Sequence, residues 1–97
     1  MEAGLFLVER YLPGATQDDA ATAAERVAAA TAQMAAEGIS VRYLGATFIP
    51  ADETCFHEFE ASSPEVVEWV NERANAPFAR ILPAVRLSTR QRRRRSA

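Results

Sequence analysis

The chain has 97 residues, of which 48% are hydrophobic and 25% are charged. This length suits one small domain, and this composition excludes a collagen-like or largely disordered chain. The net charge is −2, but residues 1–87 carry six arginines against 13 acidic residues, a net charge of −7, and the last ten residues carry five arginines. Because an acidic body disfavours phosphate binding, a nucleic-acid partner is not expected.

The sequence contains no apolar stretch of the ~18 to 20 residues that a membrane helix needs, and its start lacks the basic and apolar segments of a signal peptide. We therefore expect a cytoplasmic protein with no membrane partner. Cys55 and His57 are the single cysteine and the single histidine of the chain. An intramolecular disulfide and a histidine-rich metal site are thus excluded.

Residues 4–12 are the first predicted strand, because they form a β-type run that ends at Pro13-Gly14, a dipeptide typical of turns. Thr16 is a suitable N-cap for a helix, and two aspartates follow it in the first turn, where they complement the helix dipole. An alanine-rich segment then runs to Gly38, a typical residue just after a helix end. Its stripe of small side chains predicts a helix that packs closely on a sheet.

Residues 39–49 and 54–61 are rich in β-branched and aromatic residues, and the four residues between them predict a hairpin connection. Alternation in the first of these strands separates Val41, Tyr43 and Ile49 from Leu44, Ala46 and Phe48.

A second helix is predicted to begin at Pro64 and to end near Asn75, with Ser62 or Ser63 as its N-cap. A final strand lies within residues 78–87. Because Pro83 has no N–H group for a ladder hydrogen bond, this strand is expected at an edge of the sheet or with a bulge.

The order βαββαβ predicts a ferredoxin-like α+β domain over residues 1–87, in which a four-stranded antiparallel sheet carries two helices on one face. Residues 88–97 are predicted to be a disordered arginine-rich tail. Apolar residues occupy both faces of the expected strands, so the face away from the helices should also be covered. We therefore expect a homodimer that packs sheet to sheet, as a dimeric α/β barrel.

Three segments, LFLVERYLPGAT (5–16), VRYLGATFIPADETCF (41–56) and FEASSPE (59–65), resemble the nickel-binding-protein-like family of small bacterial ferredoxin-fold proteins. This resemblance implies the same fold and a dimeric α/β barrel. Nickel binding in such relatives implies histidine ligands. In this sequence Arg10 stands before the turn, where a histidine of a relative is expected, so the metal site is not carried over.

His57 and Cys55 lie two residues apart on one strand and should face the same side. Together they offer two ligands to a soft metal ion, or a thiol and a base for catalysis, although their backbones would be ~7 Å apart. A second copy would have to supply further metal ligands. A packed, hydrogen-bonded histidine is the structural alternative.

Glu9 points to the same face of the first strand as Leu5 and Leu7, and because this strand is expected beside the third one, its carboxylate could reach His57 across the sheet and act with it as a general base. Tyr43 could join them as a hydrogen-bond donor to a ligand. The structural alternative is a set of cross-strand ion pairs on or near the subunit interface, formed by Glu9, Arg10, Arg42, Glu58 and Glu60.

These residues predict a homodimeric binding protein for a small molecule or, as in the family, a metal ion. Glu9, Tyr43 and His57 are the candidate ligand-binding residues, and His57 and Cys55 are the candidate metal ligands. The alternative is a cofactor-free dimeric α/β-barrel enzyme of monooxygenase or isomerase type that uses the first three residues. An interaction module that acts through the arginine-rich tail is a third possibility. The sequence identifies no cofactor.

Overall fold

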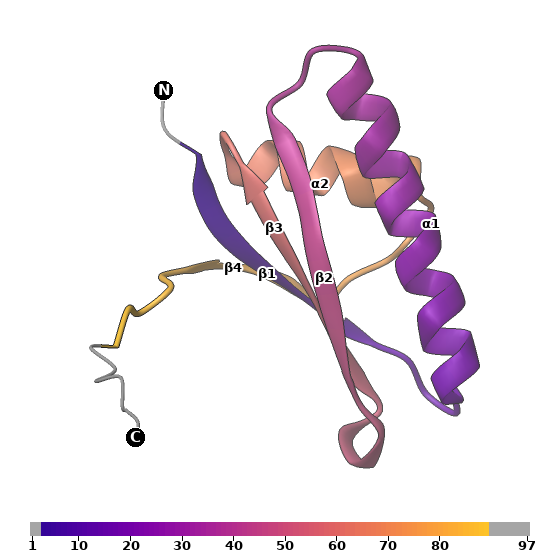
Figure 1. The fold of residues 1–97 in the computed structure, drawn as a ribbon. Helices are drawn as coiled ribbons and strands as arrows, with labels where there is room; N and C mark the ends of the chain where they lie inside the picture. The colour runs from indigo at the N-terminus through magenta and orange to yellow at the C-terminus, as the bar shows by residue number, and fades with distance from the viewer. Residues whose placement is uncertain (1–2, 90–97) are drawn as a thin grey trace, which may run out of the picture.

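The computed structural model describes residues 3–89, so most of the predicted tail lies outside the described residues. Within them, four strands and two α-helices follow the order βαββαβ (Figure 1). The strands form one antiparallel sheet in the order β2-β3-β1-β4. The predicted ferredoxin-like α+β fold is therefore confirmed. The strands are β1 (Gly4–Tyr11), β2 (Val41–Ile49), β3 (Thr54–Ala61) and β4 (Arg80–Ala84); the helices are α1 (Gln17–Ala36), α2 (Pro64–Arg73) and the short 3-10 helix η1 (Pro50–Asp52).

Both long helices begin at the caps that the sequence predicts. The Thr16 hydroxyl accepts a hydrogen bond from the backbone N–H of Asp19, and the Asp19 carboxylate accepts one from the backbone N–H of Thr16. Ser63 caps α2 in the same way through the N–H of Val66, with Pro64 in the first helical position. These bonds satisfy N–H groups that have no partner inside the helix, which fixes where each helix starts.

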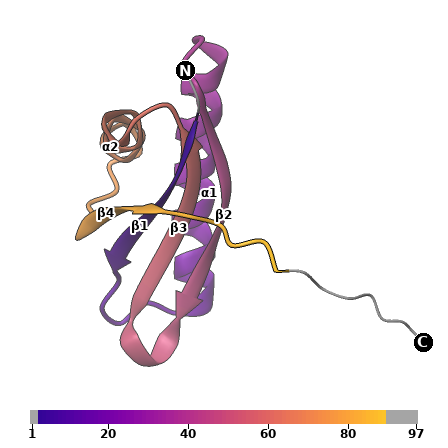
Figure 2. The ribbon, with the colours of Figure 1, turned by 90° about the vertical axis from the view of Figure 1, so that its left-hand side faces the viewer.

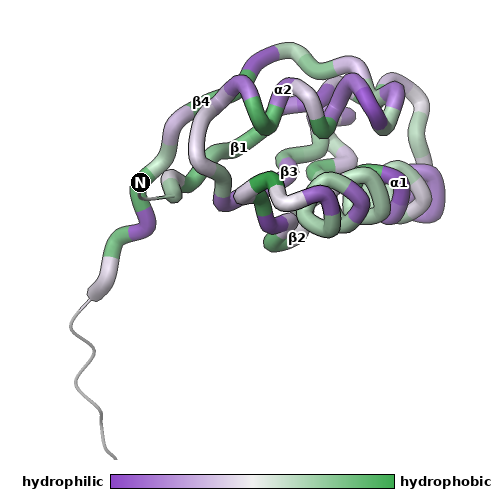
Figure 3. Tube along the Cα trace, turned by 90° about the horizontal axis from the view of Figure 1, so that it is seen from above, coloured by the Kyte–Doolittle hydropathy of each residue, from purple (hydrophilic) through white to green (hydrophobic). Residues whose placement is uncertain are grey.

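The hydrophobic core lies between one face of the sheet and the two helices. Figure 3 shows hydrophobic and hydrophilic residues alternating along α1, as expected for a helix with one buried side. The sheet contributes alternate residues of its strands, and the helices contribute valines, alanines and a methionine. The core residues are Phe6, Val8, Val27, Ala30, Met34, Val41, Phe59, Ala61, Val66, Val67, Val70 and Ala76.

A β-bulge in β2 changes which residues face the helices. Tyr43 pairs with Phe59 and Gly45 pairs with Glu58, so Leu44 is an extra residue in the ladder. Gly45 has φ +142°, a backbone conformation that residues with a side chain rarely adopt. Because parity reverses here, the predicted separation of side chains in this strand is wrong beyond residue 44, for Ala46, Phe48 and Ile49. Ala46 pairs with His57 and Phe48 pairs with Cys55, so both share the helix-covered face with Tyr43.

The opposite face of the sheet is not covered by either helix. In Figure 2 the strands lie in front of α1, and this face is turned toward the viewer. It carries half-buried apolar side chains from all four strands, which we call the open-face patch: Leu5, Leu7, Leu44, Phe56 and Leu82. No helix of the described residues is long and apolar enough to span a bilayer.

Candidate functional site

Tyr43 and His57 form a hydrogen-bonded pair under the helix layer. The Tyr43 hydroxyl lies 2.8 Å from Nδ1 of His57, and the Tyr43 ring also packs edge-on against Phe59. The bonded ladder brings the two residues together, because Tyr43 of β2 lies opposite Phe59, two positions from His57 on β3. His57 is completely buried.

Burial keeps both members of this pair uncharged near neutral pH. It lowers the pKa of His57 to about 4 and raises the pKa of Tyr43 well above its ordinary value. Either the Tyr43 hydroxyl donates to Nδ1 or a protonated Nδ1 donates to the hydroxyl oxygen, depending on the tautomer of the neutral ring. Nε2 is buried and has no hydrogen-bond partner among residues 3–89. An unpaired buried polar atom costs about 1 to 3 kcal/mol of folding free energy.

Arg10 adds a positive charge to this region. It lies opposite Cys55 in the β1–β3 ladder, on the helix-covered face. Its own pKa is lowered by partial burial first and then by the charge of Arg26. After burial, the charge of Arg10 is the second cause that lowers the pKa of His57. The field of Arg10 thus favours neutral or anionic species beside His57 over cations.

Cys55 is a buried thiol whose pKa is raised by burial and partly lowered again by Arg10. A raised pKa leaves the sulfur protonated and weakly nucleophilic at neutral pH. His57 does not serve as its base, because Nδ1 is bonded to Tyr43 and Nε2 has no hydrogen-bond partner among residues 3–89, so neither ring nitrogen contacts the thiol. The arrangement therefore does not support thiol catalysis.

The expected contact between Glu9 and His57 is wrong. In the ladder Glu9 lies opposite Phe56 and His57 lies opposite Val8, so the two side chains point to opposite faces of the sheet. The Glu9 carboxylate instead accepts a hydrogen bond from Nε of Arg80 on β4. Strand alternation explains the difference, because Glu9 shares parity with Leu5 and Leu7, and that parity faces away from the helices.

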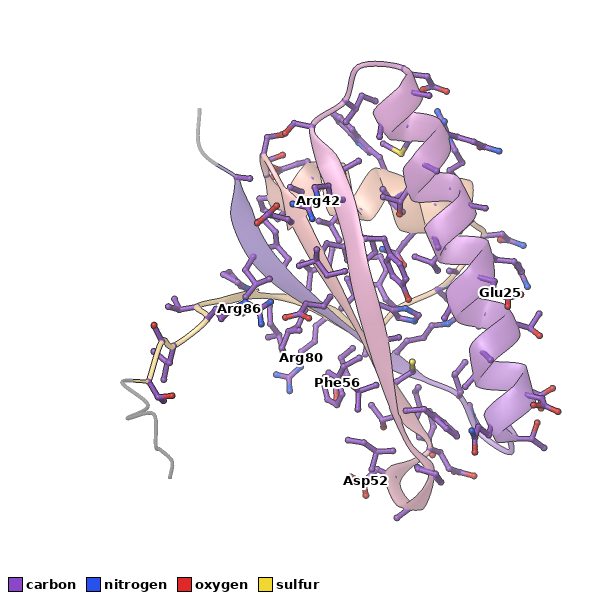
Figure 4. All side chains as sticks on the ribbon, in the orientation of Figure 1. Glu25, Arg42, Asp52, Phe56, Arg80 and Arg86 are labelled. Atoms are coloured by element: carbon purple, nitrogen blue, oxygen red, sulfur yellow. The ribbon has the colours of Figure 1, made fainter. Side chains whose placement is uncertain are left out.

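Cross-strand ion pairs, the structural alternative for the charged strand residues, are present around the open-face patch for four of the five predicted residues; Arg10 is the exception, because its parity places it opposite Cys55 on the helix-covered face. Besides the pair of Glu9 and Arg80, Arg42 contacts Glu60 at 2.9 Å and Arg86 contacts Glu58 at 2.8 Å. Figure 4 shows Arg42, Arg80, Arg86 and Phe56 on the side of the sheet away from α1, whereas Glu25 projects from the far side of that helix. These ion pairs leave an apolar surface with charged borders.

Two hollows lie near these features. One, of about 320 Å³, lies between α1 and the start of β2 and is lined by residues of both elements: Ala28, Thr31, Ala32, Ala35, Val41, Arg42 and Tyr43. The other, of about 430 Å³, lies on the open face and is lined by Leu7, Leu44, Gly45, Ala46, Thr47, Phe56 and Glu58. Both hollows exceed the size of a few water molecules and open to solvent.

A metal site is not complete in one copy of the chain. Among residues 3–89, no three histidine, cysteine, aspartate or glutamate side chains come together as a metal site requires. Cys55 and His57 offer two donors at most, and the positive charge of Arg10 opposes a cation there. The residues of one copy therefore do not fit a divalent metal ion.

Asn71 is a buried polar residue that sequence reasoning missed. It is 1% exposed, its Nδ2 donates to the carbonyl of Val67 at 2.8 Å, and its Oδ1 finds no partner in the described part of the chain. The available signal was its position one turn after Val67, within the apolar side of α2. A polar residue on that side of a helix indicates a special role or an unpaired group.

The fold and this buried pair define the chain as a ferredoxin-like α+β protein with a neutral polar pair in its core. The family model described as "Nickel responsive protein SCO4226-like" matches residues 6–83. The chain therefore belongs to the SCO4226-like family. The crystal structure of SCO4226 from Streptomyces coelicolor A3(2) is similar, with a TM-score of 0.68 and 26% sequence identity over 88% of this chain and 99% of that one. No curated protein matches.

Proposed function

We propose that this chain is a homodimeric binding protein in which two copies pack through their open sheet faces and each copy holds a small organic ligand beside Tyr43. The open-face patch is the observation that carries the proposal. Five large apolar side chains lie together on one face, and half-buried apolar surface of this kind usually marks an interface.

The borders of this face suit a symmetric contact. The ion pairs Arg42–Glu60, Arg86–Glu58 and Arg80–Glu9 place neutralised charges around the apolar centre, which is the usual arrangement of an interface with an apolar core and a polar rim. A two-fold axis would bring the patch of one copy onto the same patch of the other. The hollow over Leu7, Leu44 and Phe56 would then be enclosed between the two sheets.

The hollow between α1 and β2 is the proposed ligand site. Tyr43 lines it, and beside its bond to His57 the hydroxyl oxygen keeps a lone pair that can accept one further hydrogen bond. The other walls are largely alanine and valine, which suits an apolar molecule with one N–H or O–H donor. His57 acts here as a positioning residue, because its Nδ1 fixes the direction of the Tyr43 hydroxyl.

The position of Glu9 favours a ligand-binding protein over the cofactor-free enzyme. That alternative needs a carboxylate beside His57, and Glu9 lies on the other face of the sheet, bound to Arg80. The pair of Tyr43 and His57 has no acid or base with a pKa near 7. The family description names a response to nickel; a nickel site built from residues 3–89 would need donors from two copies, because that part of one copy does not assemble three.

The dimer is tested with Phe56→Glu, which places a charge in the patch, and with Trp69→Glu as a control. Trp69 lies on α2, away from the open face, and is 50% exposed. Light scattering after size exclusion should show a dimer for the wild type and the control. For Phe56→Glu we expect the dissociation constant to rise at least ~100-fold, which corresponds to about 2.7 kcal/mol. A monomeric wild type would refute the interface.

The ligand site is tested by native mass spectrometry of the protein as purified. Ala32→Leu fills the hollow beside Tyr43, whereas Ala29→Leu makes the same change at an exposed position of α1 that does not line it. A retained mass should be present in the wild type and in the control and should be lost in Ala32→Leu. Equal retention in both variants, or no retained mass in the wild type, would contradict a site at this position.

A further inference from the structure

A third hollow lies at the end of α2, where the chain turns toward β4. It has a volume of about 330 Å³ and is separate from the hollows beside Tyr43 and on the open face. Its walls come from the last turn of the helix and the loop that follows: Asn71, Glu72, Asn75, Ala76, Pro77 and Phe78. No residue of the hollows beside Tyr43 and on the open face lines it.

Asn71 presents an unpaired acceptor in the wall of this hollow. Its side chain is held in place by the hydrogen bond from Nδ2 to the carbonyl of Val67, and its backbone carbonyl accepts from Ala76 at 2.8 Å. Oδ1 is buried without a partner in the described residues. A buried amide oxygen of this kind needs an N–H or O–H donor from outside the chain.

The charge of the hollow is negative. Glu72 lines it, and no basic side chain does so among the described residues. The neighbouring Arg73 is bound to Glu37 of the helix α1 end through two hydrogen bonds, of 2.7 and 3.1 Å, so it does not neutralise Glu72. Phe78 adds an aromatic ring and Pro77 adds an apolar surface. An aromatic ring beside a carboxylate favours a cation on an apolar stem.

We propose that this hollow binds a small organic cation with N–H donors, an alkylammonium or alkylguanidinium group, with Asn71 Oδ1 and the Glu72 carboxylate as its acceptors. The alkyl stem would lie against Pro77 and Phe78. This site is independent of the proposed ligand site at Tyr43 and of the dimer, because it shares no lining residue with either.

The probe for this site is propylammonium chloride, and the readout is the NMR shift of the Asn71 side-chain amide and of the backbone amides of residues 71–78. Tetramethylammonium, which has the same charge but no N–H group, is the matched control, with sodium chloride keeping the ionic strength constant. For a ligand of four heavy atoms, saturation with a dissociation constant of about 1 mM is expected. Tetramethylammonium should bind at least about 10-fold more weakly.

Two variants separate this site from general attraction to an acidic surface. Glu72→Gln removes the lining carboxylate, and Glu68→Gln makes the same change one turn earlier, at an exposed position that does not line the hollow. Propylammonium binding should weaken at least about 10-fold in the first and stay unchanged in the second. Asn71→Leu should abolish it, and if that variant does not fold, the Glu72→Gln result decides.

Three results would overturn the proposal. They are shifts that never saturate, equal binding of propylammonium and tetramethylammonium, and equal weakening in Glu68→Gln and Glu72→Gln. The last result would assign the binding to surface charge, and the first would leave Oδ1 of Asn71 to a water molecule.

Discussion

The hydroxyl of Tyr43 lies 2.8 Å from Nδ1 of His57, across the β2–β3 ladder and beneath α1. This bond joins two groups that burial keeps neutral, and it fixes the orientation of the histidine ring. It also connects the hollow that Tyr43 lines to the centre of the core, where His57 lies. A change at either residue should therefore be felt in both stability and ligand binding.

Removal of the hydroxyl should destabilise the protein more than the loss of an ordinary surface hydrogen bond. Tyr43→Phe leaves Nδ1 of a buried histidine without a donor, and we expect the free energy of unfolding to fall by about 1 to 3 kcal/mol. The control is Tyr11→Phe, since Tyr11 is exposed and its hydroxyl contacts Glu53 at 3.3 Å. Urea unfolding measures the loss of unfolding free energy in both variants. Equal losses in Tyr43→Phe and Tyr11→Phe would show that the hydrogen bond with His57 does not stabilise the protein more than a surface bond does.

Stability should fall in acid through His57. Its folded pKa of about 4 lies below the unfolded value of 6.5, so the unfolded chain binds a proton first as the pH falls. The contribution of His57 to the free energy of unfolding is therefore fully present above pH 6.5. As the pH falls from 6.5 to 4, the free energy of unfolding decreases by roughly 3 kcal/mol through this residue. Urea unfolding of the wild type and of His57→Gln over this range measures the histidine part as their difference. A constant difference across this range would contradict the lowered pKa.

Replacement of Gly45 should disturb the bulge. Gly45→Ala forces a side chain into a backbone conformation with φ +142°, although no atom lies within 4 Å of the new methyl group. We expect a loss of about 1 to 2 kcal/mol from backbone strain alone. Gly4→Ala is the control, because its methyl group would meet the ring of Phe6 at an ordinary 3.4 Å. If both variants unfold at the same urea concentration, Gly45 is not strained.

Any nickel binding by this protein should not depend on His57. Nδ1 is bonded to Tyr43, Nε2 is buried, and the positive charge of Arg10 acts on the ring, so His57 is poorly placed to bind a nickel ion. Calorimetric titration of the wild type and of His57→Ala with nickel chloride should give the same result. Saturable binding by the wild type that disappears in His57→Ala, but not in Tyr11→Phe, would make the histidine a ligand after all.

Much of the fold follows from local signals in the sequence. Thr16 and Ser63 are helix caps whose hydrogen bonds are complete within three residues, so spacing alone reveals them. Pro83 places β4 at an edge because a proline cannot donate to a ladder, and β4 pairs with β1 only. These features depend on chemistry within a few residues, and for that reason they could be predicted.

The candidate site was less predictable because it depends on which face each strand residue occupies. One extra residue at the bulge reverses the parity of β2, and nothing local in the sequence announces it apart from Gly45. Neighbouring strands alone suggest a contact between Glu9 and His57. Two side chains on adjacent strands meet only when they point to the same face of the sheet, and Glu9 shares its face with Phe56, not with His57. Tyr43 does contact His57, since it precedes the bulge; whether this pair serves a ligand stays a prediction.

The two edges of the sheet differ from its open face in how they can meet another molecule. The free edge of β2 is interrupted by the bulge at Gly45, and the free edge of β4 by Pro83, which has no N–H to offer. A bulge and a proline are both devices that stop an incoming strand from extending a hydrogen-bond ladder. Edge-to-edge growth into fibres is thus blocked at both sides, even though the strands are rich in β-forming residues. The face-to-face contact proposed above would be closed by a two-fold axis, so it would end at two copies and would not propagate.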